Sequence, residues 1–254
     1  MKDVLLIGIG PGDPRQVTYE AVDALRRATV FFVLDKGSGK DELVHLRKAI
    51  LERYRPAGDY RLVQVADPQR DAEAVDYVAA VQGWHRQRAT LYARLLTDEM
   101  GAGDIGGFLL WGEPALYDST LRVLQLVREG GVSLRLEVIP GISSVQALAA
   151  RHQVPLNRIG EPLVVLPGRR LADQGRVNNV VVMLDGQCAF AALDDPELLI
   201  YWGAYLGTED EVLIAGPLPL VKARILQVRE QARARKGWIM DTYLLRRELS
   251  PEVA

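Results

Sequence analysis

The chain has 254 residues, of which 48% are hydrophobic and 25% charged, enough for one large hydrophobic core or two smaller ones. Its formal net charge of -2 provides no basic patch for nucleic acid, so a nucleic-acid partner is not expected. The single cysteine, Cys188, excludes an intrachain disulfide and is expected to be a small core residue of a cytoplasmic protein. No stretch approaches the roughly 18 uninterrupted apolar residues of a membrane span, so no membrane partner is expected.

Short apolar runs alternate with amphipathic stretches in the first half of the chain, which is typical of a mostly parallel sheet covered by helices. The first run is short and ends in glycines, so it predicts a strand rather than a signal peptide. Five strands are predicted, at residues 4–9, 30–34, 62–65, 108–111 and 134–139. Helices are predicted around residues 21–28 and over 41–54, 71–99 (one long helix or two abutting ones) and 119–129.

The pattern changes after Pro140. Strands are predicted at residues 163–166, 180–184, 198–205, 212–215 and 238–245, with few helices between them, which indicates a mixed or antiparallel sheet. The charged stretch 222–236 is interpreted as a surface helix with a solvated face. We therefore predict two α/β domains, at residues 1–138 and 139–254.

A glycine-rich turn follows the first predicted strand. Gly8, Gly10 and Gly12 precede a helix, and Asp35 ends the second strand, as in a dinucleotide-binding domain. That fingerprint needs a third glycine where this chain has Asp13, and a carboxylate there would repel a phosphate. An NAD-binding domain is therefore a disfavoured alternative.

Two further motifs follow the fourth and fifth predicted strands. Residues 111–119 read WGEPALYDS, and residues 138–144 read VIPGISS. Ligands of open α/β sheets collect at the carboxyl ends of strands, where Glu113 could accept hydrogen bonds and Ser143 or Ser144 could reach a ligand. Each motif alone is also compatible with an ordinary turn or a helix cap.

Together, and in this order, the three motifs resemble those of the tetrapyrrole methylase family. The resemblance implies two α/β domains with S-adenosylmethionine in the cleft between them, release of S-adenosylhomocysteine, and a homodimer. Most members carry Asp where this chain has Glu113, so a longer side chain would have to contact the cofactor. The implied cofactor contacts are Pro11, Gly112, Glu113, Leu116, Ser143, Ser144, Met183 or Leu184, and Leu206 or Gly207.

Longer stretches resemble a deacetylating branch of this family. This branch adds a methyl group to a ring carbon of a cobalamin precursor and releases an acetyl group as acetate. Another methylase of the same fold and a non-catalytic corrinoid carrier remain alternatives. The stretches are residues 31–37, 111–122, 156–162, 183–186, 201–208 and 236–247.

Methyl transfer to an activated ring carbon depends mainly on alignment and exclusion of water, and it requires no metal. The three histidines, His45, His85 and His152, show no ligand spacing and are interpreted as ordinary surface or core residues. Loss of the acetyl group is expected to need a general acid or base. The candidates are Asp35, Lys36, Tyr117, Asp118 and Asp185, although each could instead be a cap, a loop anchor or a solvated charge.

A tetrapyrrole substrate carries several carboxylate arms, which arginine can bind with two parallel hydrogen bonds. Arginines near the motif loops are therefore candidate substrate contacts, although arginines are common on any surface. The candidates are Arg122, Arg151, Arg158, Arg169 and Arg170.

Overall fold

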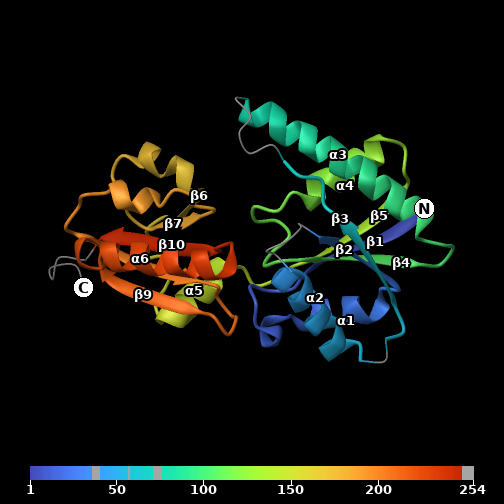
Figure 1. The fold of residues 1–254 in the computed structure, drawn as a ribbon, viewed down its shortest axis with the longest axis horizontal. Helices are drawn as coiled ribbons and strands as arrows, with labels where there is room; N and C mark the ends of the chain where they lie inside the picture. The colour runs from blue at the N-terminus through green and yellow to red at the C-terminus, as the bar shows by residue number, and fades with distance from the viewer. Residues whose placement is uncertain (36–40, 57, 71–75, 248–254) are drawn as a thin grey trace. The chain divides into compact units, whose positions relative to one another are not determined.

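The computed structural model describes residues 1–35, 41–56, 58–70 and 76–247. The chain forms two compact units, Met1–Ile142 and Ser143–Ala254, and each contains one five-stranded sheet (Figure 1). No helix in these described ranges has both the length and the apolar character needed to cross a membrane. Each unit contains both strands and helices, which confirms the predicted α/β class.

The first unit is built on a parallel sheet with the strand order β3-β2-β4-β1-β5. All four neighbouring pairs are parallel, as the sequence predicts. The inner strands β1, β2 and β4 are largely buried, which explains why their sequences read as short apolar runs, whereas the edge strands β3 and β5 have several exposed positions. They are β1 (Lys2–Gly8), β2 (Val30–Asp35), β3 (Arg61–Ala66), β4 (Ile105–Leu110) and β5 (Leu134–Ile139).

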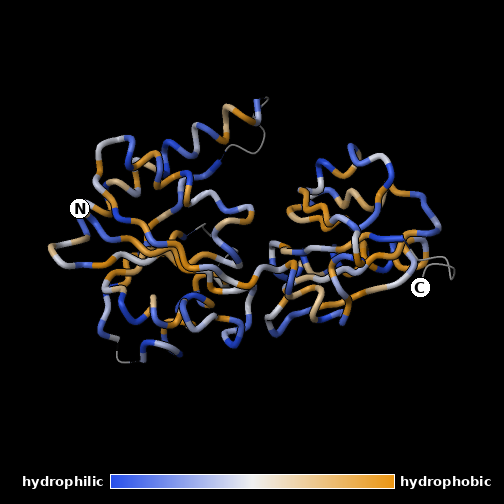
Figure 2. Tube along the Cα trace, turned by 180° about the vertical axis from the view of Figure 1, so that it is seen from behind, coloured by the Kyte–Doolittle hydropathy of each residue, from blue (hydrophilic) through white to orange (hydrophobic). Residues whose placement is uncertain are grey.

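Helices cover both faces of this sheet (Figure 1). Leu5 and Ile7 of β1 pack in one cluster with residues of α1 (Tyr19–Arg27) and α2 (Asp41–Tyr54). Val4 and Leu6 pack in another with residues of α3 (Tyr77–Asp98) and α4 (Thr120–Glu129). Side chains alternate between the two faces of a strand, so β1 contributes to both clusters. Figure 2 shows hydrophobic residues concentrated along the strands, between helices with many hydrophilic positions.

The second unit is built on a mixed sheet with the strand order β6-β7-β10-β8-β9. β6 and β7 are parallel, whereas the other three pairs are antiparallel, which confirms the predicted mixed sheet. Its elements are α5 (Ser144–His152), β6 (Val164–Pro167), β7 (Val180–Met183), β8 (Leu198–Ala204), β9 (Val212–Pro217), α6 (Leu218–Lys236) and β10 (Asp241–Arg247). Short 3-10 helices cover Pro14–Gln16, Gly168–Gln174 and Ala189–Ala192.

The charged helix α6 is not solvated along its whole length. Arg229 is buried, and its Nε lies 2.9 Å from a carboxylate oxygen of Asp241, whose side chain is 5% exposed. The indole Nε1 of Trp202 donates to the same oxygen at 2.9 Å, and Nη2 of Arg229 donates to the carbonyl of Asp185 at 2.6 Å. The prediction of a solvated charged face is therefore wrong at Arg229, which anchors α6 to the sheet.

Candidate functional site

The connections that follow β1 and β4 lie on opposite faces of the first sheet. These strands are parallel neighbours, but β1 continues towards α1 on one face and β4 towards α4 on the other (Figure 1). In open α/β sheets, ligands bind outside the carboxyl ends of the two strands where the connections diverge. The GPGDP and GEP segments leave the sheet at these two ends. The topology thus places two of the three predicted motifs where a ligand is expected.

The three motifs of the first unit meet through their backbones. Gly112 N–H donates to the Gly10 carbonyl at 2.9 Å, and Gly10 N–H donates to the Gly112 carbonyl at 3.3 Å. Both glycines have positive φ, +77° at Gly10 and +71° at Gly112. A Cβ built on Gly141 would lie 2.2 Å from the Gly112 carbonyl oxygen, and one built on Gly8 would lie 2.6 Å from the Gly141 nitrogen. We call these four residues the glycine junction.

Glu113 links two of the motif loops. One carboxylate oxygen accepts the Ala115 N–H at 2.8 Å, and the other accepts the Gly141 N–H at 2.7 Å. The longer side chain of Glu113 therefore contacts backbone groups of the first unit, while its contact with the cofactor stays a prediction. Each carboxylate oxygen has a second lone pair, so an added hydroxyl donor can still be accepted. Of the other predicted cofactor contacts in this unit, Pro11 is buried and Leu116 is half-buried.

Residues at the end of the second motif have distinct roles. Asp118 accepts the Thr120 N–H at 2.6 Å and so caps the first turn of α4. Tyr117 has a positive φ of 55° and is 43% exposed. Arg122 is exposed on α4. At the end of β2, Asp35 accepts a hydrogen bond from the Gln64 amide at 3.1 Å, whereas the candidate Lys36 lies outside the described residues.

Arg47, which the sequence analysis did not single out, lies near this edge. Its Nε donates to the Leu109 carbonyl at 3.0 Å, and its Nη1 donates to the Leu43 carbonyl at 2.8 Å. Burial lowers the pKa of Arg47, and the charge of Asp118 opposes that shift. The sequence offers no signal for Arg47, since its surroundings come from α2, β4 and the second motif.

The predicted serines lie at the start of α5. Ser143 is buried and caps this helix: its hydroxyl accepts the Val145 N–H at 3.1 Å, while the Gln146 side chain accepts the Ser143 N–H at 3.1 Å. This reciprocal arrangement is a capping box. Ser144 is the first residue of the helix and is half-buried. Ser143 is therefore explained by its helix, whereas Ser144 is not.

Two later segments of the second unit contain the remaining cofactor candidates. Met183 ends β7 and is half-buried, and Leu184 follows with a positive φ of 53° and 62% exposure. Leu206 is buried, and Gly207 has a φ of +79° with its N–H donated to Glu211 at 2.8 Å. Single exposed apolar side chains are common on protein surfaces, so the exposure of Leu184 does not by itself indicate a ligand.

Asp185 is an anchor for the loop after β7. It is 4% exposed and accepts hydrogen bonds from the Ala189 N–H at 2.7 Å, the Tyr243 hydroxyl at 2.6 Å and the Gln187 N–H at 3.2 Å. Burial, followed by the hydrogen bond to Asp185, raises the pKa of Tyr243. These contacts match the loop-anchoring alternative for Asp185, and the catalytic role remains a prediction.

The predicted substrate arginines of the second unit mostly have local partners. Arg151 pairs with Glu211 at 2.6 Å, and Arg170 pairs with Asp173 at 2.8 Å. Arg158 donates to the carbonyl of Arg247, and Arg169 is exposed. A carboxylate ligand would have to compete with Glu211 and Asp173 for the first two.

Cys188 is half-buried rather than a core residue, and burial raises the pKa of its thiol. Cys188 has a positive φ of 57° and lies in a loop just before a 3-10 helix, which explains why its side chain is not fully buried. Among the histidines, His45 is exposed, while His85 and His152 are half-buried with pKa values lowered by burial. Within the described ranges, no three His, Cys, Asp or Glu residues are grouped so that they could hold a metal ion.

Comparisons with known proteins agree over nearly the whole chain. The model of the Tetrapyrrole (Corrin/Porphyrin) Methylases matches residues 3–221. A precorrin-6A synthase (deacetylating) from Sinorhizobium sp. is 48% identical over 250 residues, covering 97% of this chain and 96% of the relative. The crystal structure of a putative cobalamin synthesis related protein, CobF, from Corynebacterium diphtheriae superposes with a TM-score of 0.84 at 36% identity, covering 97% and 99% of the two chains. A uroporphyrin-III C-methyl transferase from Thermus thermophilus, complexed with S-adenyl homocysteine, shares the fold, with a TM-score of 0.57 at 18% identity and coverage of 96% and 92%.

Proposed function

Because this chain belongs to the tetrapyrrole (corrin/porphyrin) methylases, we propose that it is a precorrin-6A synthase (deacetylating). Such an enzyme transfers a methyl group from S-adenosylmethionine to ring carbon one of precorrin-5 and releases acetate. The observation that carries the proposal is the likeness to the Sinorhizobium enzyme, which spans both units rather than one shared domain. The proposal also requires the three motif loops to lie together, and the close packing of the glycine junction supports this requirement.

The proposed cofactor is S-adenosylmethionine, which the family uses, and the residues present fit it. At the glycine junction, three loops pack backbone against backbone, which fixes the positions of the loops that carry the proposed contacts Pro11, Gly112 and Glu113. Glu113 retains acceptor sites for hydroxyl donors, and Leu116 offers an apolar contact. The proposed contacts are Pro11, Gly112, Glu113, Leu116, Ser143, Ser144, Met183, Leu184, Leu206 and Gly207.

The bound cofactor supplies a methyl group on a positively charged sulfur. Transfer to a ring carbon is an in-line displacement, so the contribution of the protein is to align the two groups and exclude water. Rigid loops serve that purpose best. The bridge between Gly10 and Gly112 and the Glu113 contact with Gly141 hold three loops in one arrangement.

Acetate release needs a proton donor or acceptor near the substrate. Among the candidates, Asp118 already caps α4, and Asp185 is buried within its own loop. At the carboxyl edge of the first sheet, Tyr117 is exposed and Asp35 is half-buried, and neither one caps a helix. We therefore propose Tyr117 and Asp35, with Lys36 beside the latter, as the first positions to test for the deacetylation step.

The test is a product assay. Purified protein is incubated with precorrin-5 and S-adenosylmethionine labelled in its methyl group, and both labelled product and free acetate are measured. Equimolar methyl incorporation and acetate support the proposal. Methyl incorporation without acetate indicates a different methylase of the same fold, and no incorporation indicates a corrinoid carrier.

We further propose that the protein is cytoplasmic, which its single cysteine favours, and that it acts as a homodimer, which the family resemblance implies. Light scattering coupled to size-exclusion chromatography measures the mass directly. A mass of about twice 28.1 kDa supports the dimer, whereas a mass near 28.1 kDa contradicts it.

A further inference from the structure

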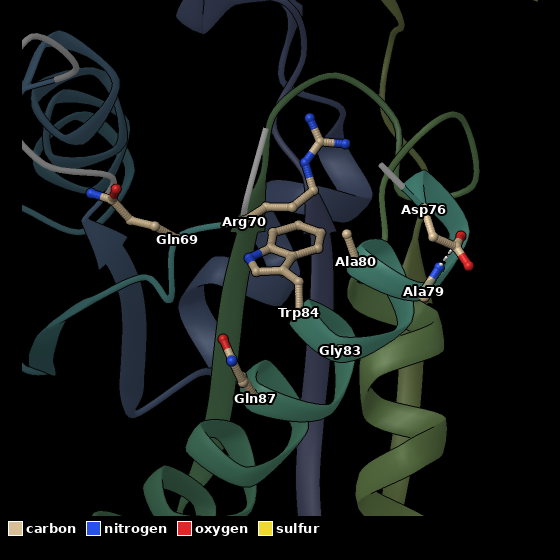
Figure 3. Close-up of a pocket in the computed structure, with 8 residues that line it drawn as sticks. All are labelled: Gln69, Arg70, Asp76, Ala79, Ala80, Gly83, Trp84 and Gln87. Carbon is tan, nitrogen blue, oxygen red and sulfur yellow. Dashed lines mark hydrogen bonds between the residues drawn. The ribbon is translucent and has the colours of Figure 1, made fainter. Parts of the chain in front are cut away.

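A cavity of about 440 Å³ lies beside the first half of α3 (Figure 3). Ala80 and Gly83 of the helix form part of its wall, and Trp84 and Arg70 contribute the large side chains. In Figure 3 the Arg70 side chain extends past the Trp84 ring, and Gln87 lies on the other side of that ring. Small-molecule pockets span roughly 300–1,000 Å³, so this one suits part of a large ligand.

The Trp84 ring is held in place before any ligand arrives. Its Nε1 donates to the Pro68 carbonyl at 2.6 Å, and the guanidinium of Arg88 lies 4.7 Å from the ring centroid. Arg88 is itself buried and fixed, with its Nε 2.9 Å from an Asp67 carboxylate oxygen and its Nη1 donating to the Ser119 hydroxyl at 2.9 Å. A buried cation of this kind is maintained only with such partners. It supports a rigid aromatic platform.

The same contacts locate the cavity relative to the glycine junction. Asp67 and Pro68 follow the carboxyl end of β3, and Asp67 N–H donates to the Asp35 carbonyl at 2.7 Å, extending the ladder with β2. Ser119 ends the second motif. The cavity therefore opens at the edge of the sheet where the motif loops lie, within the same unit.

The described residues that line the cavity include one cationic side chain, Arg70, and one acidic side chain, Asp76. Within the described residues, Arg70 has no carboxylate within ion-pair distance, and its guanidinium lies 5.2 Å from the Tyr77 ring centroid. The lining carboxylate of Asp76 is already used to cap α3, accepting the Ala79 N–H at 2.9 Å. His85, next to Trp84 in α3, has its pKa lowered by burial and by the charges of Arg122 and Arg88, so two further arginines lie close to this part of the helix.

We propose that this cavity binds one carboxylate-bearing corner of the tetrapyrrole substrate, with Arg70 pairing with the acid arm and Trp84 packing against the apolar ring to which the arm is attached. Arginine matches a carboxylate with two parallel hydrogen bonds, and a tryptophan face suits a flat pyrrole ring. This inference rests on the proposed function, because it takes the tetrapyrrole as the ligand.

The experiment compares Arg70→Gln, Trp84→Ala and Trp84→Phe with a matched control, Arg86→Gln, an exposed arginine of the same helix outside the cavity. Arg70→Gln should raise the KM for precorrin-5 roughly tenfold, with kcat within about twofold and unchanged affinity for S-adenosylhomocysteine. Trp84→Phe, which keeps an aromatic face, should lose less than Trp84→Ala. Circular dichroism establishes that each variant is folded.

A second measurement separates failure of this inference from failure of the proposed function. The probe is uroporphyrin III, a stable tetrapyrrole with eight carboxylate arms, titrated against each protein. Weaker binding to Arg70→Gln and Trp84→Ala than to Arg86→Gln supports the subsite even if wild-type protein forms no methylated product. Equal KM values and equal probe affinity in Arg70→Gln and Arg86→Gln overturn it, as does a loss confined to Trp84→Ala.

Discussion

Substitution of Gly141 by alanine should damage the site far more than the fold. The new Cβ would lie 2.2 Å from the Gly112 carbonyl oxygen and 2.9 Å from both the Cα and the carbonyl carbon of Gly8. All of these are backbone atoms, so no side-chain rotation can relieve the overlap. The loops after β1, β4 and β5 would have to separate by about 1 Å to reach ordinary van der Waals distance.

That displacement sets the expected magnitudes. Overpacking by one methyl group usually destabilises a protein by about 1–3 kcal/mol, which a well-folded unit tolerates. A 1 Å misplacement of catalytic geometry can lower a rate about 100-fold. Gly141→Ala should therefore remain folded while its kcat/KM falls by about two orders of magnitude and its affinity for S-adenosylhomocysteine falls in parallel.

The assays are urea unfolding, calorimetric titration with S-adenosylhomocysteine, and the labelled methyl-transfer reaction. Gly101→Ala is the control, because its Cβ would meet only Asp104 Oδ2, at an ordinary 3.6 Å. If Gly141→Ala is folded and keeps both its cofactor affinity and its activity within about twofold of the control, the glycine junction is not the cofactor site.

Three further predictions concern other residues. Glu113→Gln should lose one charge-assisted hydrogen bond, which lowers the free energy of unfolding in urea by about 1.5–3 kcal/mol and weakens S-adenosylhomocysteine binding. Unchanged values of both would contradict the role of Glu113 in linking the two loops. Burial lowers the pKa of His152, so its contribution to stability is complete above about pH 6.5 and is lost as pH falls through the folded pKa. In urea unfolding, the free energy of unfolding of His152→Gln should therefore depend less on pH between about pH 5 and 7 than that of the wild type. Arg229→Leu should destabilise the protein by about 3–5 kcal/mol, and adding Asp241→Asn should recover part of that; a cost equal to that of an exposed arginine would exclude the buried pair.

The inner strands β1 and β2 could be predicted because buried parallel strands leave continuous apolar runs, whereas the edge strand β5 shows apolar residues in alternation with polar ones. The prediction for β5, residues 134–139, matches the structure at both ends. β4 was predicted to begin at Phe108 but begins at Ile105, because Gly106 and Gly107 hide the pattern. A Cβ on Gly107 would lie 2.8 Å from the Phe31 ring. The two glycines make room for aromatic residues of the neighbouring strand, which sequence alone does not reveal.

The second unit departs further, at the junction of α6 and β10. The last strand was predicted at residues 238–245 and lies at Asp241–Arg247. Gly237 ends α6 with a positive φ of 75°, and Trp238 packs edge-on against Tyr205, with ring centroids 5.0 Å apart. The apolar character of Trp238 thus reflects a contact with a distant loop rather than a strand. The helix also begins earlier than predicted, at Leu218, with a proline in its first turn.

The motifs of the candidate site could be predicted from the sequence, but the contacts that hold its residues in place could not. A motif lies within one short segment, so sequence order exposes it. Arg88 donates to Tyr92 of the same helix, but its other two partners, Asp67 and Ser119, lie on opposite sides of it in the chain and far from it in sequence. The same applies to Glu113, whose contact with Gly141 spans two strand ends. Periodicity cannot report such pairs, because it concerns neighbours on a single element.

The structure also separates the glycine motif from the dinucleotide-binding arrangement that it resembles. In that arrangement, a helix begins directly at the glycine loop and its N-terminus meets the pyrophosphate. Here Asp13 caps a short 3-10 helix, accepting the Arg15 N–H at 2.8 Å, and α1 begins only at Tyr19 behind its own cap, Thr18. The glycines therefore serve contact between loops rather than approach of a helix end. The Gly10, Gly112 and Gly141 N–H groups are donated to partners within these loops, so this arrangement lacks the helix N-terminus that would bind a pyrophosphate.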